Sequence, residues 1–273
     1  MFPGCGARGI APPNGMKILK QIFVVAIFAG ALFSIFRYLP LSTDAAAQRK
    51  ALARREIALR VLAEYLAGEF PGQKALIVSN PFAQQKNKPR IIAAFEEAGI
   101  RGLKKGWSGK VHLQGIGIPE LDPAAMKHPT DLSIDRQTTT PLSYLTTAGA
   151  WDQLLRDHPG TDLVVSLIGL PATLRNLEIW QQAKPHFALL LPDLRMIGGA
   201  AEIAEAFSAG KLAAVILEKP GAPIESAPLA RDYHVEFNHR FVLVTPKNFR
   251  EILEGSRRSV LREAVQILAA TQE

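Results

Sequence analysis

Polar side chains follow several strongly apolar segments of this chain, at the points where strands are expected to end. A hydroxyl, a carboxamide, a carboxylate and an ammonium group are present among them, and such groups hydrogen-bond to polar small molecules. In an open α/β sheet these positions gather at the carboxyl ends of the strands, where ligands bind. The candidate ligand-binding residues are Ser79, Asn80, Ser166, Asp193 and Lys219.

Patterns for catalysis or metal binding are weaker. Ser166 lacks the flanking glycines of a GxSxG nucleophile elbow. His234, Glu236 and His239 have side chains that could gather a metal ion. A β-strand that projects His234 and Glu236 from one face, with His239 in a turn, is the favoured interpretation. We therefore expect no catalytic residue and no metal site, although an enzyme without a recognisable motif stays an alternative.

Nucleotide cofactors need a glycine-rich turn that lets the backbone approach a phosphate. The turn after the first expected strand, SNPFAQQKNKP, has no glycine, and Gly115-Ile116-Gly117 is followed by a proline instead of a helix. No GxxxxGK[ST] sequence occurs. The one cysteine, Cys5, precedes the α/β region and leaves it without a disulfide or a cysteine-ligated zinc site. We expect no cofactor.

Short apolar segments alternate with amphipathic ones from residue 73 onwards. Continuously apolar strands that alternate with helices indicate a parallel sheet covered on both faces. The expected fold class is α/β, with a doubly wound, mainly parallel sheet of about five to six strands in three layers. Strands are expected at 74–79, 110–117, 162–169, 186–192, 212–218 and 240–245, and helices at 89–100, 151–158, 172–183, 200–210 and 247–271.

Two details of this pattern bear on the site. Gly99 indicates the end of the helix at 89–100, and the pair Glu96 and Glu97 is interpreted as part of its solvated face. The long polar connection 118–147 is either a binding loop over a ligand or an insertion packed over an edge of the sheet.

The segment before the α/β region predicts membrane attachment. The run QIFVVAIFAGALFSIF, residues 21–36, carries no charge and has Lys17, Lys20 and Arg37 at its ends. A cleaved signal peptide with a site near Ala45 and a buried core helix are the alternatives to an uncleaved anchor. We expect an unstructured leader at 1–16, a transmembrane anchor or uncleaved signal at 17–41, a basic amphipathic helix at 45–68 and the α/β domain at 73–273.

The charge distribution separates the same two parts. The whole net charge of +7 comes from residues 1–60, and residues 61–273 hold equal numbers of acidic and basic side chains. A nucleic-acid-binding domain needs an excess of Lys and Arg, so nucleic acid is not an expected partner. The basic flank fits contact with anionic lipid headgroups instead. The helix at 45–68 either packs on the sheet or forms a stalk or dimerising coil.

The segments KALIVSNPF and DLVVSLIGLPA, within a run of βα units at 73–246, resemble a single lobe of type I periplasmic-binding-protein-like domains. That resemblance implies that Ser79, Asn80, Ser166 and Asp193 face a ligand cleft, and that the domain recognises a ligand without transforming it.

The sequence therefore predicts a single-pass membrane protein whose α/β domain binds a small molecule or a partner protein. A structural or accessory subunit of a membrane complex is the alternative. The start at Met16 resembles an export signal and favours the extracytoplasmic side for this domain, whereas the positive-inside rule, read literally, places it in the cytoplasm.

Overall fold

The computed structural model describes residues 45–84, 89–124, 134 and 138–254. The expected leader at 1–16 and the expected anchor at 17–41 lie outside these residues. Within them, no helix combines the length and the apolar character that crossing a bilayer requires. Membrane attachment therefore stays a prediction from the sequence.

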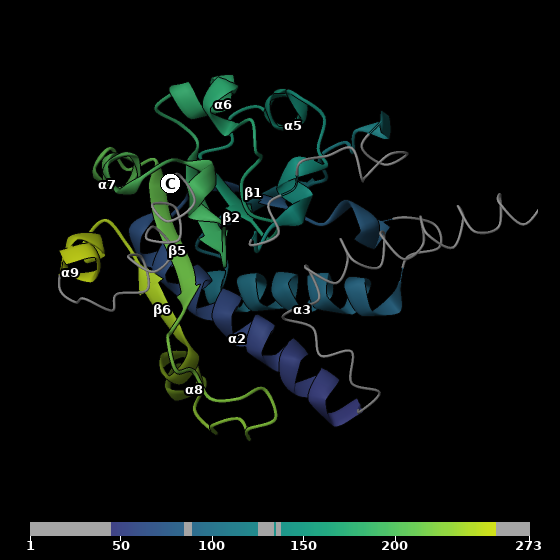
Figure 1. Ribbon diagram of the computed structural model, residues 1–273, viewed down its shortest axis with the longest axis vertical. Helices are drawn as coiled ribbons and strands as arrows, with labels where there is room; N and C mark the ends of the chain where they lie inside the picture. Colours follow the sequence, from purple (N-terminus) through teal and green to yellow (C-terminus); the bar gives the residue numbers. More distant parts are fainter. Residues whose placement is uncertain (1–44, 85–88, 125–133, 135–137, 255–273) are drawn as a thin grey trace, which may run out of the picture.

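Six strands form one sheet in the described part of the chain, in the order β2-β1-β3-β4-β5-β6 (Figure 1). The first five run parallel, and β6 pairs antiparallel with β5. The prediction of an α/β fold with a mainly parallel sheet is confirmed. The strands are β1 (Lys74–Val78), β2 (His112–Gly117), β3 (Leu163–Ser166), β4 (His186–Leu190), β5 (Leu212–Glu218) and β6 (Phe241–Val244).

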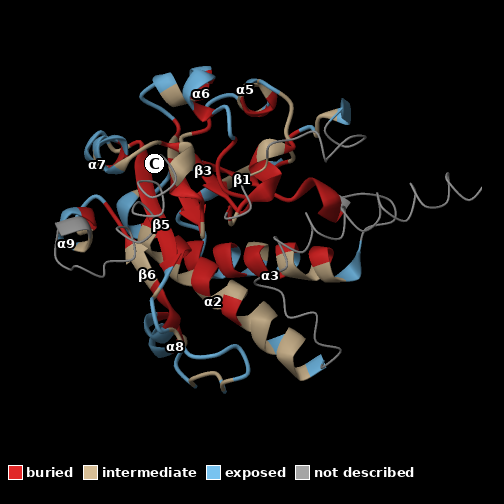
Figure 2. Ribbon diagram, viewed as in Figure 1, coloured by how far each residue is buried: buried red, intermediate tan, exposed pale blue. Residues whose placement is uncertain are grey.

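Helices cover both faces of this sheet (Figure 2). The strand side chains that point to one face and those that point to the other are both apolar, so both faces are buried. One face packs against α2 (Ala45–Glu69), α3 (Arg90–Trp107) and α8 (Tyr233–Arg240). The opposite face packs against α5 (Ala150–Asp157), α6 (Glu178–Gln181), α7 (Ala200–Ser208) and α9 (Phe249–Glu254). Short 3₁₀ turns are η2 (Pro81–Gln84), η4 (Pro141–Tyr144), η5 (Leu174–Asn176) and η6 (Leu194–Met196).

Helix α2 packs on the sheet and on α3, as one of the two sequence interpretations predicted. The expected end of the next helix at Gly99 is wrong, because α3 continues to Trp107. Its glycines are there for close packing: a Cβ on Gly102 would overlap the carbonyl oxygen of Glu56 in α2. A glycine that signals a helix end in isolation here lets two helix backbones approach each other.

Two further expectations need correction. The expected helix at 172–183 is two short turns, because Leu177 is extended and the Asp152 carboxylate starts α6 by accepting from the backbone of Ile179. The expected strand through His234 is the helix α8, whose first turn is capped by the Asp232 side chain. Asp at an N-cap satisfies backbone N–H groups that would otherwise lack partners.

Candidate ligand-binding site

The chain changes direction across the sheet between β1 and β3, which lie side by side. From β1 the chain crosses one face through α3 to reach β2, and it returns across the other face through α5 to reach β3. In open α/β sheets, ligands bind outside the carboxyl ends of the strands at such a switch point. The structure has a cavity of about 110 Å³ there, bounded by Asn80 after β1, Ile168 after β3 and Leu191 after β4.

A buried carboxylate organises the polar end of this cavity. Glu96 of α3 is only 6% exposed, and its Oε1 lies 2.6 Å from Arg55 Nη2 of α2. Its Oε2 accepts a hydrogen bond from Ser79 Oγ at 2.6 Å and one from Asn80 N at 3.1 Å. Because both oxygens have partners and the charge is balanced, this carboxylate is stable away from water. The interpretation of Glu96 as a solvated side chain is wrong.

Arg55 is held from a second direction. Its Nε donates to the Phe95 carbonyl oxygen at 2.9 Å, so the guanidinium is fixed against α3 by two contacts. A planar guanidinium that is held in this way presents its remaining N–H groups in a defined direction. Arg55 therefore brings a positive charge to the wall of the cavity.

Asn80 contributes a free hydrogen-bond donor. Its Oδ1 accepts from Phe82 N at 2.9 Å, which leaves the Nδ2 group without a hydrogen bond to the part of the chain that the structure describes. The residue is 4% exposed and lines the cavity. Nδ2 is thus a donor at the cavity wall, to which an acceptor atom of a ligand could bind.

Most of the remaining wall is apolar. Leu142 and Pro141 belong to the turn η4, Ile168 follows β3, and Leu190 ends the neighbouring strand β4. A cavity of this size exceeds the space that one water molecule needs by several fold. It therefore suits a compact molecule with an apolar body and a hydrogen-bond acceptor directed at Asn80. The lining residues are Arg55, Asn80, Ile92, Phe95, Glu96, Thr139, Thr140, Pro141, Leu142, Leu167, Ile168, Leu190 and Leu191.

The structure brings together only part of the predicted set. Asn80 lines the cavity and Ser79 contacts Glu96 behind it. Ser166 Oγ donates to the Gly169 carbonyl oxygen at 2.5 Å, within its own turn. Asp193 pairs with Arg195 at 2.6 Å, and Lys219 Nζ donates to the Asn238 carbonyl oxygen at 2.6 Å. The last three do not line this cavity, and a ligand-binding role for them stays a prediction.

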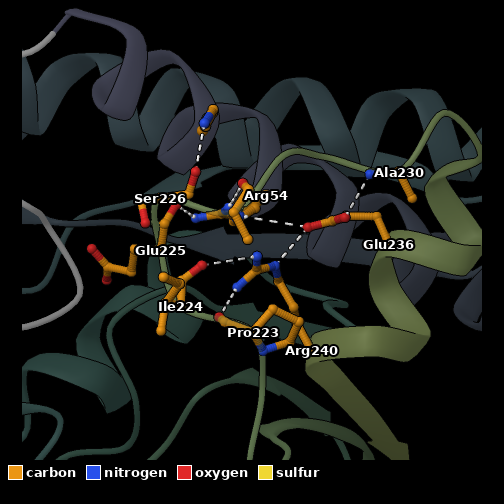
Figure 3. A network of polar contacts seen from close by, with 10 residues as sticks. Arg54, Pro223, Ile224, Glu225, Ser226, Ala230, Glu236 and Arg240 are labelled. Atoms are coloured by element: carbon orange, nitrogen blue, oxygen red, sulfur yellow. Dashed lines mark hydrogen bonds and ion pairs between the residues drawn. The ribbon is translucent and has the colours of Figure 1, made fainter.

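A second polar network lies next to this site (Figure 3). Glu236 of α8 accepts from Arg240 Nε at 2.6 Å and lies 3.5 Å from Arg54 Nε of α2. Burial by itself raises the pKa of Glu236, but the hydrogen bonds from Ala230 N and Arg240 and the charges of both arginines outweigh it and lower the pKa. The network is therefore ionised and structural in character.

A second cavity of about 100 Å³ adjoins this network. Glu218 at the end of β5 is part of its lining, and burial together with the nearby Glu225 raises the pKa of the Glu218 carboxyl. The two cavities have Arg55, Phe95, Leu190 and Leu191 in common. They are neighbours along one edge of the sheet.

The possible metal set is not assembled. Glu236 is occupied by Arg240 and Ala230, and His234 Nε2 lies 3.5 Å from Glu64 Oε2 instead. Across 45–84, 89–124, 134 and 138–254, no three His, Cys, Asp or Glu side chains are placed to hold a metal ion.

Sequence reasoning missed Arg55 and Glu96, which carry the polar end of the site. Both lie on helices in charged segments that read as solvated surface, and no motif marks them. Only the packing of α2 against α3 places the two side chains together.

No family model matches the chain, and no curated protein matches it. Several solved structures are similar to it, among them two binding proteins. One is a sugar ABC transport system substrate-binding protein from Bordetella parapertussis 12822, with 14% identity over 60% of this chain and 41% of that chain, and a TM-score of 0.36. The other is a sugar ABC transporter sugar-binding protein from Bacillus halodurans, with 9% identity over 71% and 62% of the two chains and a TM-score of 0.38.

Both structures are named as binding proteins of sugar ABC transport systems. The chain spans less than two thirds of the length of either one. At these TM-scores the likeness carries no argument about a ligand.

Proposed function

We propose that the α/β domain binds a small molecule in the cavity at the switch point between β1 and β3. The observation that carries this proposal is the Asn80 Nδ2 donor at the cavity wall, which has no hydrogen-bond partner among the described residues. An acceptor atom of a ligand that enters the cavity could take a hydrogen bond from this donor.

The cavity wall supports a class of ligand. Its polar end combines the neutral donor of Asn80 with the Arg55–Glu96 pair, and its other walls are mainly apolar. Such a site favours an uncharged or singly anionic molecule with a compact apolar body and one or two acceptors. Monosaccharides are among the compounds to test, since their ring and hydroxyl oxygens can accept a hydrogen bond from Asn80 Nδ2.

We further propose that residues 17–41 anchor the domain in a membrane as a single pass, with the domain on the extracytoplasmic side. The support for the anchor is the uncharged run at 21–36 with basic residues at both ends. The support for the side is that the start at Met16 resembles an export signal. Extraction of membranes that contain the full-length chain with alkaline carbonate tests the anchor, because an integral protein stays in the pellet. Protease added to intact cells or spheroplasts reports the side.

The ligand proposal is tested by thermal unfolding of the full-length chain, purified in a mild detergent, against monosaccharides, short carboxylic acids, amino acids and nucleosides. A compound present at a hundred times its dissociation constant stabilises the folded state by about 2.7 kcal/mol, which raises the melting temperature measurably.

Two matched variants locate the site. Asn80→Asp keeps the acceptor for Phe82 N but replaces the Nδ2 donor with an oxygen, so the shift caused by an active compound should disappear. Ser166→Ala removes a hydroxyl that is committed to Gly169 outside the cavity, so the shift should remain. A ligand whose effect survives Asn80→Asp, or no active compound in the panel, contradicts the proposal.

A further inference from the structure

Helix α2 runs antiparallel to β1, so its first half lies at the carboxyl edge of the sheet. The second cavity is lined by Ala51, Arg54 and Arg55 of this half, together with Leu190 at the end of β4 and Glu218 at the end of β5. Arg55 and Leu190 also line the first cavity. The described chain enters the domain through Ala45, at this edge. Whatever precedes α2 therefore joins the molecule on the side that carries the candidate site.

The loop after β5 is fastened to the same end of α2 (Figure 3). Lys50 Nζ donates to the Ser226 carbonyl oxygen at 2.7 Å, and Arg54 donates to the carbonyls of Glu225 and Ala227 at 2.6 and 2.9 Å. Arg240 holds the Pro223 carbonyl oxygen from the other side. Backbone carbonyls held by three cations fix the course of this loop.

Ile224 lies inside this fastened loop and is 74% exposed, the highest value among the large apolar side chains that the structure describes as exposed. Its backbone is anchored, but its side chain contacts mainly solvent. A single exposed apolar residue needs no explanation by itself. Ile224 lies beside the first turns of α2, however, and the sequence predicts a membrane anchor just before Ala45. That anchor offers an explanation for the exposed side chain.

The predicted anchor ends at Leu41, and residues 42–44 separate it from Ala45. Even a fully extended chain covers no more than about 14 Å between Leu41 and Ala45. Along α2, Lys50 and Arg54 lie about 8 and 14 Å beyond Ala45, at 1.5 Å per residue. The loop that these two side chains hold is thus within reach of the surface of a bilayer that contains residues 17–41.

We propose that the carboxyl edge of the sheet rests on the bilayer surface, with Ile224 entering the headgroup region. The inference depends on the anchor that we propose above. The exposed Arg49, next to Lys50 in the first turns of α2, adds a cation that suits anionic headgroups. In this orientation both cavities lie on the membrane side of the domain.

The test uses the full-length chain with Cys5→Ser, which removes the one native thiol. A nitroxide is attached to Ile224→Cys, and in a control chain to Ser108→Cys, an exposed residue between α3 and β2 at the opposite edge of the sheet. Both proteins are reconstituted in vesicles of phosphatidylcholine and phosphatidylglycerol at 3:1. Relaxation by oxygen, which concentrates in lipid, is compared with relaxation by a water-soluble nickel chelate.

We expect the label at 224 to be several-fold less accessible to the nickel chelate, relative to oxygen, than the label at 108. Equal accessibility at both positions, in protein that stays with the vesicles after a carbonate wash, overturns the docking and leaves the anchor intact. Protein that leaves the vesicles in that wash shows that the anchor itself is wrong, and the docking fails with it.

Discussion

Arg55 Nη2 lies 2.6 Å from Glu96 Oε1, and this contact joins α2 to α3 beside the candidate ligand site. The two residues are far apart in the sequence, and each is charged and on a helix. Together they turn two surface-forming side chains into a buried pair with no net charge. The backbone N–H of Asn80 donates to Glu96, and this bond holds Asn80 next to the pair.

Glu96→Gln should destabilise the fold. The substitution leaves the Arg55 charge without its counter-ion in a mostly buried place, and breaking such a pair costs about 3 kcal/mol. Urea unfolding at neutral pH measures the change. Glu97→Gln is the matched control, because Glu97 is the adjacent, exposed carboxylate and its loss should alter the free energy of unfolding by less than about 0.5 kcal/mol. Equal effects of the two variants would contradict the assigned role of Glu96.

Gly102→Ala should also destabilise the fold, although alanine favours a helix by about 1 kcal/mol over glycine. The new Cβ meets the Glu56 carbonyl oxygen and the backbone of Arg60, which cannot move without separating α2 from α3. We expect a net loss of about 2 kcal/mol, from overpacking. Gly68→Ala, where nothing lies within 4 Å of the new Cβ, should instead add about 0.5 kcal/mol in the same denaturation assay.

Glu236→Gln tests the network that holds the loop after β5. At neutral pH we expect a loss of about 3 kcal/mol, because Arg240 and Arg54 lose a buried carboxylate. The pKa of Glu236 is lowered in the folded state, so its stabilising effect is complete above its ordinary value near 4.5 and is lost as the pH falls through the lowered pKa. The difference between the variant and the native chain should therefore shrink between pH 6 and pH 3. A difference that stays constant over that range would show that the carboxylate charge is not what matters.

Lys211 gives a prediction at the alkaline end. Burial lowers the pKa of this lysine to about 8, and its Nζ donates to the Gln182 carbonyl oxygen at 2.7 Å. Between pH 8 and pH 10.5 the unfolded chain binds the proton that the folded chain has released, so stability from this group rises with pH. The free energy of unfolding of the native chain, measured against Lys211→Met, should increase across that window. A flat difference would mean that the folded lysine keeps its proton.

The sequence predicted the α/β sheet because its strands are continuous apolar runs, such as the one from Leu212 to Leu217, and such runs need no knowledge of their neighbours. It failed where a local signal had a tertiary cause. Gly99 was read as a helix end, although glycines in α3 serve the close contact with α2. The expected strand through His234 is a different case, because the signal that corrects it is local: the Asp232 side chain caps a helix there.

The candidate site likewise contains residues that can be predicted from the sequence and residues that cannot. Asn80 could be found from the sequence, because it follows a recognisable strand and such positions converge at the edge of a parallel sheet. Ser166 was chosen by the same rule, but its hydroxyl is taken by its own turn, a detail that strand patterns do not contain. Glu96 could not be found, because a carboxylate on a helix is normally solvated, and only the meeting of two helices buries this one.

The two adjoining cavities have a wall in common, to which Arg55 and Phe95 belong. The Arg55 guanidinium is held in this wall by Glu96 and by the Phe95 carbonyl oxygen, so one fixed group borders both cavities. If a molecule in the first cavity shifted this group, it would change the affinity of the second, and thermodynamic linkage would require the same factor in the reverse direction. Two molecules bound along this edge would therefore be coupled through the partition that they both touch.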